Sequence, residues 1–145
     1  VDPVSTVKAE KLRGLLGHVH TLKPNRIEAE LLSGVKIADN ATLHQAAQAL
    51  LDQGVQRVFL SLGGDGVFAA QQGETHLEPI CKAEMRNATG AGDAMMASLV
   101  WSFLAGRDLA ESCAAGTAAA AIAVESEETI NPSMSAEAVL ARAAK

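Results

Sequence analysis

Residues 87–96, Asn-Ala-Thr-Gly-Ala-Gly-Asp-Ala-Met-Met, place small, flexible residues directly before a single acid. The pattern predicts a helix start near Gly90 and Gly92, where backbone N–H groups lack acceptors within the helix and the helix end carries partial positive charge. A phosphate can approach such a backbone because no bulky side chain blocks it, and Asp93 beside it can take a proton from an attacking hydroxyl. The same residues are equally typical of a tight turn before an acid that stabilises a helix, so both interpretations stay open.

The glycine spacing separates this segment from two common phosphate-binding motifs. In the dinucleotide-binding pattern Gly-x-Gly-x-x-Gly the third glycine would fall at Met95, which argues against a dinucleotide-dependent oxidoreductase. A Walker P-loop requires Gly-Lys-Ser/Thr after its spacer residues, and that tripeptide does not follow.

Two further segments carry polar residues or glycines at the expected ends of strands. Asn25 and Glu28 have the N-cap and N3 spacing of a capping box, which needs no ligand. The run Ser-Leu-Gly-Gly-Asp-Gly, residues 61–66, is by itself typical of a hairpin turn. Ligands of α/β proteins bind at the carboxyl ends of strands, so at Asn25 and Glu28 a ligand-binding interpretation and a structural one are compatible.

Hydrophobic periodicity and turn residues predict helices that alternate with strands, which is typical of an α/β protein with a mainly parallel sheet. Thr42 with Gln45, and Asp108 with Glu111, have capping-box spacing. The pattern places Met96, Leu99, Val100 and Phe103 on one stripe of a helix. The predicted helices cover residues 6–17, 25–34, 42–54, 92–106, 108–124 and 135–144. The predicted strands cover residues 18–22, 55–62 and 67–70, the last two as an antiparallel pair, with short edge strands at 75–80 and 81–85.

Composition narrows the class of protein. The chain has 145 residues, 48 % hydrophobic and 20 % charged, which suits one soluble globular domain. A net charge of −5 argues against a nucleic-acid partner, and no apolar run is long enough to cross a membrane. Cys81 and Cys113 form no disulfide framework, so we expect buried free thiols in a reducing, cytoplasmic compartment.

Together, the segments NATGAGDAMMASL, LKPNRIEAELLSG and LSLGGDGVFA resemble the ribokinase-like (PfkB-type) sugar and nucleoside kinases. The resemblance implies that the backbone of Gly90, Ala91 and Gly92 forms an anion hole for the transferred phosphoryl group. It also implies that Asp93 is the base that deprotonates the acceptor hydroxyl.

The same resemblance implies a site for ATP and Mg²⁺. Asn25 would lie near the nucleotide phosphates, and Glu28 would act on magnesium through water, which suits an ion that keeps several waters. Ser61, in place of the family's usual threonine, and Gly63 would contact ATP, while Gly66 would permit the turn.

The resemblance further implies that Thr117 contacts adenine. A potassium ion would be held by Asn87, the Thr89 carbonyl and oxygens from residues 123–133. Many family members carry aspartate where this chain has Asn87, so the charge that would favour the ion is missing.

The implied fold is a three-layer ribokinase-like α/β fold, with helices on both faces of a mainly parallel sheet. Residues 1–145 would form its C-terminal, ATP-binding and catalytic part. The opening Val-Asp-Pro resembles the end of a strand, so we expect the half that carries the substrate pocket and lid to precede these residues. Residues 1–145 alone are then expected to have little or no activity.

The implied function is ATP-dependent phosphotransfer to a primary hydroxyl of a sugar or nucleoside. VDPVS and GGDGV, beside the segments above, resemble the pseudouridine-phosphorylating members, so the expected acceptor is the 5′-hydroxyl of pseudouridine. Another sugar kinase, ribokinase- or fructokinase-like, and a non-catalytic nucleotide-binding module are the alternatives. For the full-length protein the family also implies a homodimer.

Overall fold

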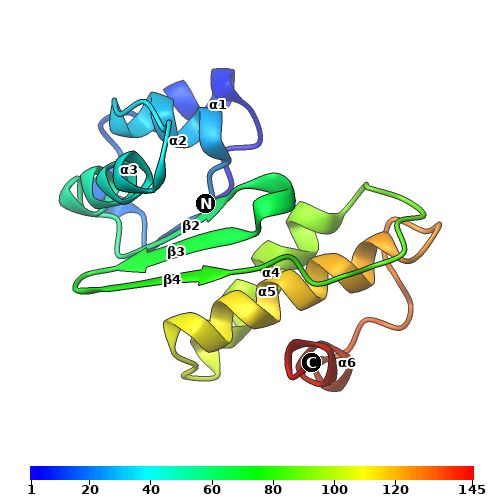
Figure 1. The fold of residues 1–145 in the computed structure, drawn as a ribbon. Helices are drawn as coiled ribbons and strands as arrows, with labels where there is room; N and C mark the ends of the chain where they lie inside the picture. The colour runs from blue at the N-terminus through cyan, green and yellow to red at the C-terminus, as the bar shows by residue number, and fades with distance from the viewer. The chain divides into compact units, whose positions relative to one another are not determined.

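The computed structural model describes residues 1–145, which form two compact units. The first unit comprises residues 1–63 and 67–77, and the second comprises residues 64–66 and 78–145. Figure 1 shows the elements in chain order. The first unit contains α1 (Thr6–Glu10), η1 (Leu16–His18), β1 (Thr21–Leu22), α2 (Arg26–Ser33), α3 (Asn40–Asp52), β2 (Arg57–Ser61) and β3 (Val67–Gln71). The turn η2 (Gly63–Asp65) and β4 (Glu74–Glu78) lie at its boundary, and the second unit contains α4 (Ala91–Leu104), α5 (Leu109–Val124) and α6 (Ala136–Ala143).

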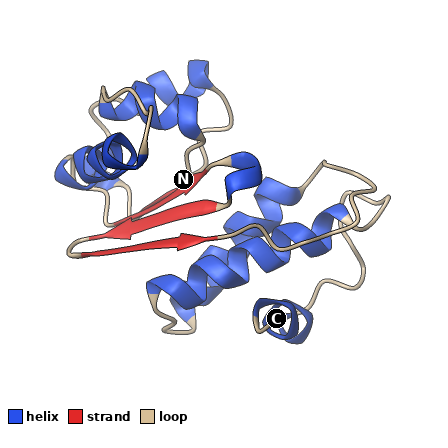
Figure 2. Cartoon of the chain, in the orientation of Figure 1, coloured by secondary structure: helices blue, strands red, loops and turns tan.

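The sheet has the strand order β1-β2-β3-β4 and is mixed rather than mainly parallel. β1 pairs with β2 in parallel, whereas β2 and β3 are antiparallel, as predicted for that pair. β3 and β4 run in opposite directions in Figure 2. The connections after β2 and β3 are tight turns, which can join only antiparallel neighbours because a parallel crossover needs a dozen or more residues.

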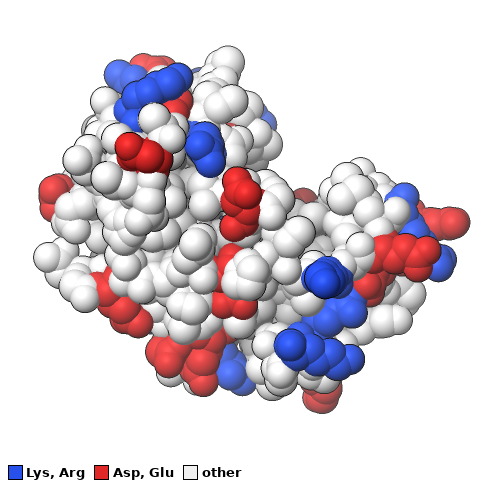
Figure 3. Space-filling model, viewed as in Figure 1, with Lys and Arg blue, Asp and Glu red and all other residues white.

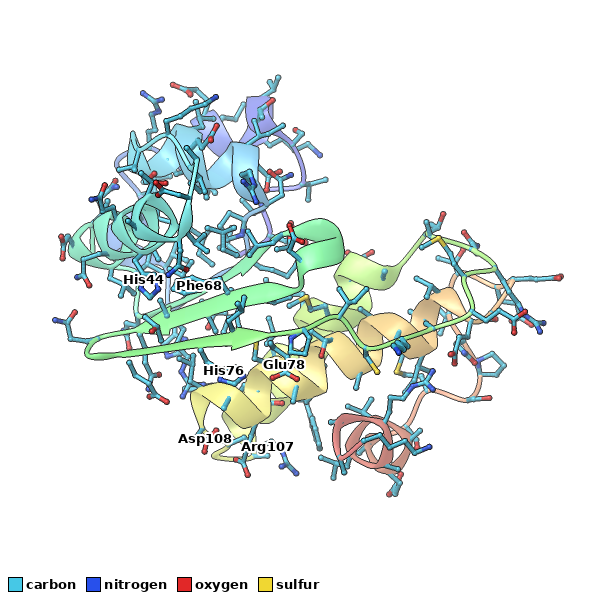
Figure 4. The ribbon with its side chains drawn as sticks, in the orientation of Figure 1. His44, Phe68, His76, Glu78, Arg107 and Asp108 are labelled. Carbon is cyan, nitrogen blue, oxygen red and sulfur yellow. The ribbon has the colours of Figure 1, made fainter.

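The helices α1, α2 and α3 lie on one face of this sheet (Figure 1) and share one core with it. Val58 and Leu60 of β2 belong to that core, while Phe59, which points to the other face, is only 1 % exposed. Burial on both faces is typical of a strand inside an α/β fold. His44 of α3 contacts Phe68 of β3 edge-on, with 4.6 Å between ring centroids (Figure 4).

Several predicted boundaries in the first unit are wrong. The helix predicted over 6–17 ends at Glu10, and Gly14 then takes a left-handed conformation with φ +78° that no helix continues through. The strand predicted over 18–22 is reduced to Thr21–Leu22. The capping box of α3 joins Asp39 to Thr42, one turn earlier than the predicted pair Thr42 and Gln45.

In the second unit, α4 and α5 pack side by side because Gly116 on α5 has no side chain. A Cβ at Gly116 would lie 3.2 Å from Leu99 and 3.3 Å from Met95 of α4. The predicted capping box of Asp108 and Glu111 is confirmed at the start of α5. α6 packs against α5, and the strand predicted over 81–85 does not form.

The buried face of α4 differs from the predicted stripe. Leu99 of that stripe is buried, but its neighbours on the buried face are Met95, Ser98 and Ser102. Val100 is 48 % exposed and Phe103 is 47 % exposed. Apolar residues surround this helix on all sides, so the sequence pattern does not define a single inward face.

Three further features concern the charges on the surface, the length and apolar character of the helices, and the burial of the cysteines. Lys and Arg side chains are interspersed with Asp and Glu on the face shown in Figure 3. None of the helices combines the length and the apolar character needed to span a membrane. Cys113 is buried as predicted, whereas Cys81 is only partly buried.

Candidate active site

In the first unit, the ends of the two parallel strands bring Asn25 and Ser61 together. The Ser61 N–H donates to the Pro24 carbonyl (2.9 Å), and Asn25 pairs with Ser61 as an isolated parallel bridge. Two residues that were predicted to contact ATP are therefore neighbours, although they are 36 positions apart in the chain. Their position at the carboxyl ends of β1 and β2 is where α/β folds bind ligands.

The capping box predicted at Asn25 and Glu28 is confirmed. The Glu28 N–H donates to Asn25 Oδ1 (2.9 Å), and the Asn25 N–H donates to Glu28 Oε2 (3.0 Å). The cap uses the oxygen of the Asn25 amide and leaves its NH₂ group, on an exposed residue, available to donate to a phosphate oxygen. A structural role and a nucleotide-binding role therefore use different atoms of the same side chain.

Two glycines of the turn after β2, Gly63 and Gly66, differ in the space available for a side chain. Gly63 has φ +62° and open space where a Cβ would be. Gly66, which belongs to the second unit, has φ +97°, and a Cβ there would lie 2.0 Å from the Glu78 carbonyl oxygen. Gly66 is therefore required by the local backbone, while Gly63 leaves its surroundings open.

In the second unit, α4 lacks the side-chain N-cap that is present at the start of all the other α-helices of the chain. Side-chain oxygens accept from backbone N–H groups at the starts of α1, α2, α3, α5 and α6. At α4 the N-cap is Gly90, and no side chain caps the helix. The first N–H groups of this helix, from Ala91 onward, are therefore open to an external acceptor.

Asp93 lies in the first turn of α4 and is exposed. It occupies N3, where an acidic side chain could reach back to the N-cap N–H, but it makes no such hydrogen bond. Asp93 therefore does not cap the helix through a hydrogen bond, although its charge in the first turn still stabilises the helix end, so both interpretations stay open. Its carboxylate stands free beside uncapped N–H groups, which is the arrangement that the catalytic interpretation requires.

Gly90 fits against the loop of residues 125–133, in the same unit. Its φ is +90°, and a Cβ would lie 2.6 Å from the Thr129 carbonyl oxygen. Just before it, Asn87 Oδ1 accepts from the Thr89 N–H (2.9 Å), and Asn87 Nδ2 donates to the Glu127 carbonyl (3.1 Å). The 125–133 loop thus packs against the start of α4.

Asn131 holds the same loop at its other end, and sequence reasoning missed this residue. Its Oδ1 accepts from the Ser133 N–H, and its Nδ2 donates to the Ile122 carbonyl. Asn-x-Thr at 87–89 and Asn-Pro-Ser at 131–133 both have the spacing of an Asx turn, which could have indicated these contacts.

Thr117 is buried within α5, and its hydroxyl donates to the Ala114 carbonyl (3.0 Å). Its assignment to the adenine pocket stays a prediction. A cavity of about 650 Å³ in this unit lies next to the 125–133 loop and is lined by charged groups such as Arg86, Glu125 and Arg142. Its lining includes residues of the 123–133 segment, whose oxygens were predicted to hold potassium, whereas Thr117 and the residues of the α4 start, Gly90 to Asp93, do not line it.

The fold and these two clusters define a ribokinase-like α/β protein. The chain belongs to the pfkB family of carbohydrate kinases, whose model matches residues 1–136. The resemblance inferred from the sequence is thus confirmed, as is the ribokinase-like α/β fold class, although the sheet is mixed. The individual roles of the site residues stay predictions.

Two curated relatives show how far the similarity extends. The chain is 41 % identical over 136 residues to pseudouridine kinase of Escherichia coli (strain K12), covering 93 % of this chain and 44 % of the relative. It is 34 % identical over 110 residues to ribokinase of Haemophilus influenzae (strain ATCC 51907 / DSM 11121 / KW20 / Rd), covering 76 % of this chain and 36 % of the relative. The chain therefore spans less than half the length of these relatives.

Two solved structures share the fold. A Clostridium perfringens protein provisionally assigned as a sugar kinase has a TM-score of 0.92 and 34 % identity, covering 99 % of this chain and 45 % of its own. Arabidopsis thaliana ribokinase complexed with ribose and ATP has a TM-score of 0.78 and 29 % identity, covering 89 % of this chain and 42 % of its own.

Proposed function

We propose that residues 1–145 carry the ATP-binding and catalytic part of a kinase that phosphorylates a primary hydroxyl of a sugar or nucleoside. The observation that carries this proposal is the start of α4, the α-helix whose first N–H groups no side chain caps. An exposed, unbonded carboxylate, Asp93, stands in that same turn. The other α-helices, including α2 where Asn25 is proposed to serve both as cap and as phosphate ligand, all begin with a side-chain cap.

The chemistry follows from these groups. The N–H groups at Ala91, Gly92 and Asp93 would donate to the oxygens of the transferred phosphoryl group, where negative charge must be stabilised. The Asp93 carboxylate would accept the proton of the acceptor hydroxyl as the hydroxyl oxygen attacks the γ-phosphorus of ATP, and the bond from that phosphorus to the bridging oxygen would break to release ADP. The Asn25 amide NH₂ and the Ser61 hydroxyl would donate to nucleotide phosphates from the ends of β1 and β2.

Magnesium is the ion that the family implies, and Glu28 fits a water-mediated role toward it. The side chain is buried, with the residue only 2 % exposed, and only Oε2 takes part in the capping box. The second carboxylate oxygen remains for water in the ion's shell, which suits an ion that keeps several waters. Bound Mg²⁺ would neutralise charge on the nucleotide phosphates.

For the acceptor we propose the 5′-hydroxyl of pseudouridine. The support is the 41 % identity to pseudouridine kinase of E. coli, beside 34 % to a ribokinase over a shorter stretch. A panel of pseudouridine, uridine, ribose and fructose, assayed with ATP on a chain extended to the length of these relatives, tests this. Preference for ribose or fructose would favour a ribokinase- or fructokinase-like member instead.

The proposed base is tested in the same extended chain with Asp93→Asn. We expect kcat to fall by about 100- to 10,000-fold while ATP affinity, measured by calorimetry, changes little. Asp108→Asn is the matched control, because it removes the same charge from another helix start and keeps an effective cap. Unchanged turnover in Asp93→Asn would refute the proposed base. ATP binding without turnover in the unsubstituted chain would indicate a non-catalytic nucleotide-binding module.

Residues 1–145 alone are expected to bind ATP weakly and to turn over little or no pseudouridine. The matched relatives are more than twice as long, so any acceptor contacts made by their remaining residues are missing here. Comparable kcat values for residues 1–145 and the extended chain would contradict this expectation.

A further inference from the structure

The side chain of Asn87 joins two loops that flank the start of α4. Its Nδ2 donates to the Glu127 carbonyl (3.1 Å), 40 residues further along the chain. Its Oδ1 accepts from the Thr89 N–H (2.9 Å), directly before Gly90. The Asn87 amide therefore connects the segment before α4 with the 125–133 loop, which contacts Gly90.

The partners of Asn87 fix which way its amide points. A backbone N–H can only donate, so the atom facing Thr89 must be the oxygen. A backbone carbonyl can only accept, so the atom facing Glu127 must be the nitrogen. Rotating the amide by half a turn would place donor against donor and acceptor against acceptor, and would lose both bonds.

The Asn87 side chain does not fit the place that it would take beside the potassium ion implied by the family resemblance. A hard cation needs oxygen ligands directed toward it, such as carboxylates and carbonyls. At Asn87 the oxygen is already engaged by the Thr89 N–H, and the atoms directed at the Glu127 carbonyl are amide hydrogens with partial positive charge. A cation at this place would meet the positive end of the amide instead of a negative oxygen.

We infer that the Asn87 amide takes the place of a monovalent cation, so that this chain holds its two loops together without potassium. Aspartate at this position would turn a second oxygen toward the Glu127 carbonyl, and two acceptors repel unless a cation lies between them. The amide bridges the same gap by donating a hydrogen bond. Asn131 uses the same device in the same loop, through the Ser133 N–H and the Ile122 carbonyl.

Thermal unfolding of residues 1–145 tests this inference, and it reports on the loops whether or not the protein transfers phosphate. The Tm of the unsubstituted chain and of Asn87→Asp is measured in KCl, NaCl and tetramethylammonium chloride at equal ionic strength. The unsubstituted chain should give the same Tm in all three salts. Asn87→Asp should lose about 3–5 °C in tetramethylammonium chloride and recover much of that loss, with saturation, as KCl replaces it.

Two further variants complete the test. Asn87→Ala, which can neither donate nor ligate, should lose a similar Tm in every salt. Asn40→Asp makes the same charge change at the exposed start of α3, and should show no response specific to potassium. A saturable rise in Tm with KCl in the unsubstituted chain would overturn the inference. It would equally be overturned if Asn87→Asp did not respond to potassium, or if Asn87→Ala were as stable as the unsubstituted chain.

Discussion

Replacing Gly90 by alanine should destabilise the start of α4 much more than replacing the glycine just beyond its other end. Gly90 and Gly106 both have positive φ, +90° and +72° respectively, so alanine is strained at either position. Around Gly106 no heavy atom lies within 4 Å of the Cβ position, whereas at Gly90 the Thr129 carbonyl oxygen lies 2.6 Å away. Both substitutions therefore carry the free-energy cost of a left-handed alanine, and only Gly90→Ala adds a steric clash.

The magnitudes follow from these two contributions. A left-handed alanine costs roughly 1–2 kcal/mol, which is the whole expected effect of Gly106→Ala. A carbon held 2.6 Å from a backbone oxygen must displace the 125–133 loop, and overpacking of this kind adds roughly 1–3 kcal/mol. We therefore expect Gly90→Ala to lower the free energy of unfolding by about 2–5 kcal/mol in total.

Trp101 provides the assay, because it is the only tryptophan in the chain and lies on α4. The guanidinium carbon of Arg107 lies 5.1 Å from its ring centroid, so unfolding of this helix changes the surroundings of the fluorophore. Urea unfolding followed by tryptophan fluorescence then compares both variants with the unsubstituted chain. Equal losses in Gly90→Ala and Gly106→Ala would refute the reasoning that the Thr129 carbonyl excludes a side chain.

Two other predictions concern stability and nucleotide binding. Asn25→Asp keeps an effective cap for α2 but replaces a donor NH₂ by a carboxylate, so urea unfolding should change little while calorimetry shows weaker ATP binding. Unchanged ATP affinity would remove Asn25 from the site. Burial, aided by the Glu78 carboxylate, raises the pKa of the Cys113 thiol from 9.0 to about 12. Between these values the unfolded chain releases a proton that the folded chain keeps, so the free energy of unfolding should fall by up to about 1.4 kcal/mol per pH unit. Cys113→Ala should flatten this fall in unfolding experiments above pH 9, and Cys81→Ala should not.

The features that were predicted correctly are mainly those that a few neighbouring residues decide. The capping boxes at Asn25 and Asp108 formed as predicted, because each closes within three residues of the chain. The hairpin after β2 formed for a similar reason, since the glycines at 63–66 permit the turn. Local rules therefore placed Asn25 and Ser61 at the ends of their strands.

The features that were missed depend on contacts between distant residues. The stripe predicted for α4 lies one residue away from its buried side, because that side is decided by Gly116 of α5 and not by the pattern of α4 itself. The bond from Asn87 to the Glu127 carbonyl spans 40 residues and ends on a main-chain atom, so no residue type at position 127 signals it. The contacts between the 125–133 loop and the start of α4 are made largely by such main-chain groups, which sequence patterns do not show.

The conformation of Gly90 explains why α4 can keep its first N–H groups open. The N-cap residues of the other α-helices, such as Ser5 and Ser135, have extended backbones, from which a side-chain oxygen reaches back to the helix. Gly90 is left-handed instead, and the direction that a Cβ would take is occupied by the Thr129 carbonyl. A serine at this position would therefore have to move the loop before it could cap the helix. The same contact that requires glycine also excludes a cap, and this keeps the N–H groups beside Asp93 available to an anion.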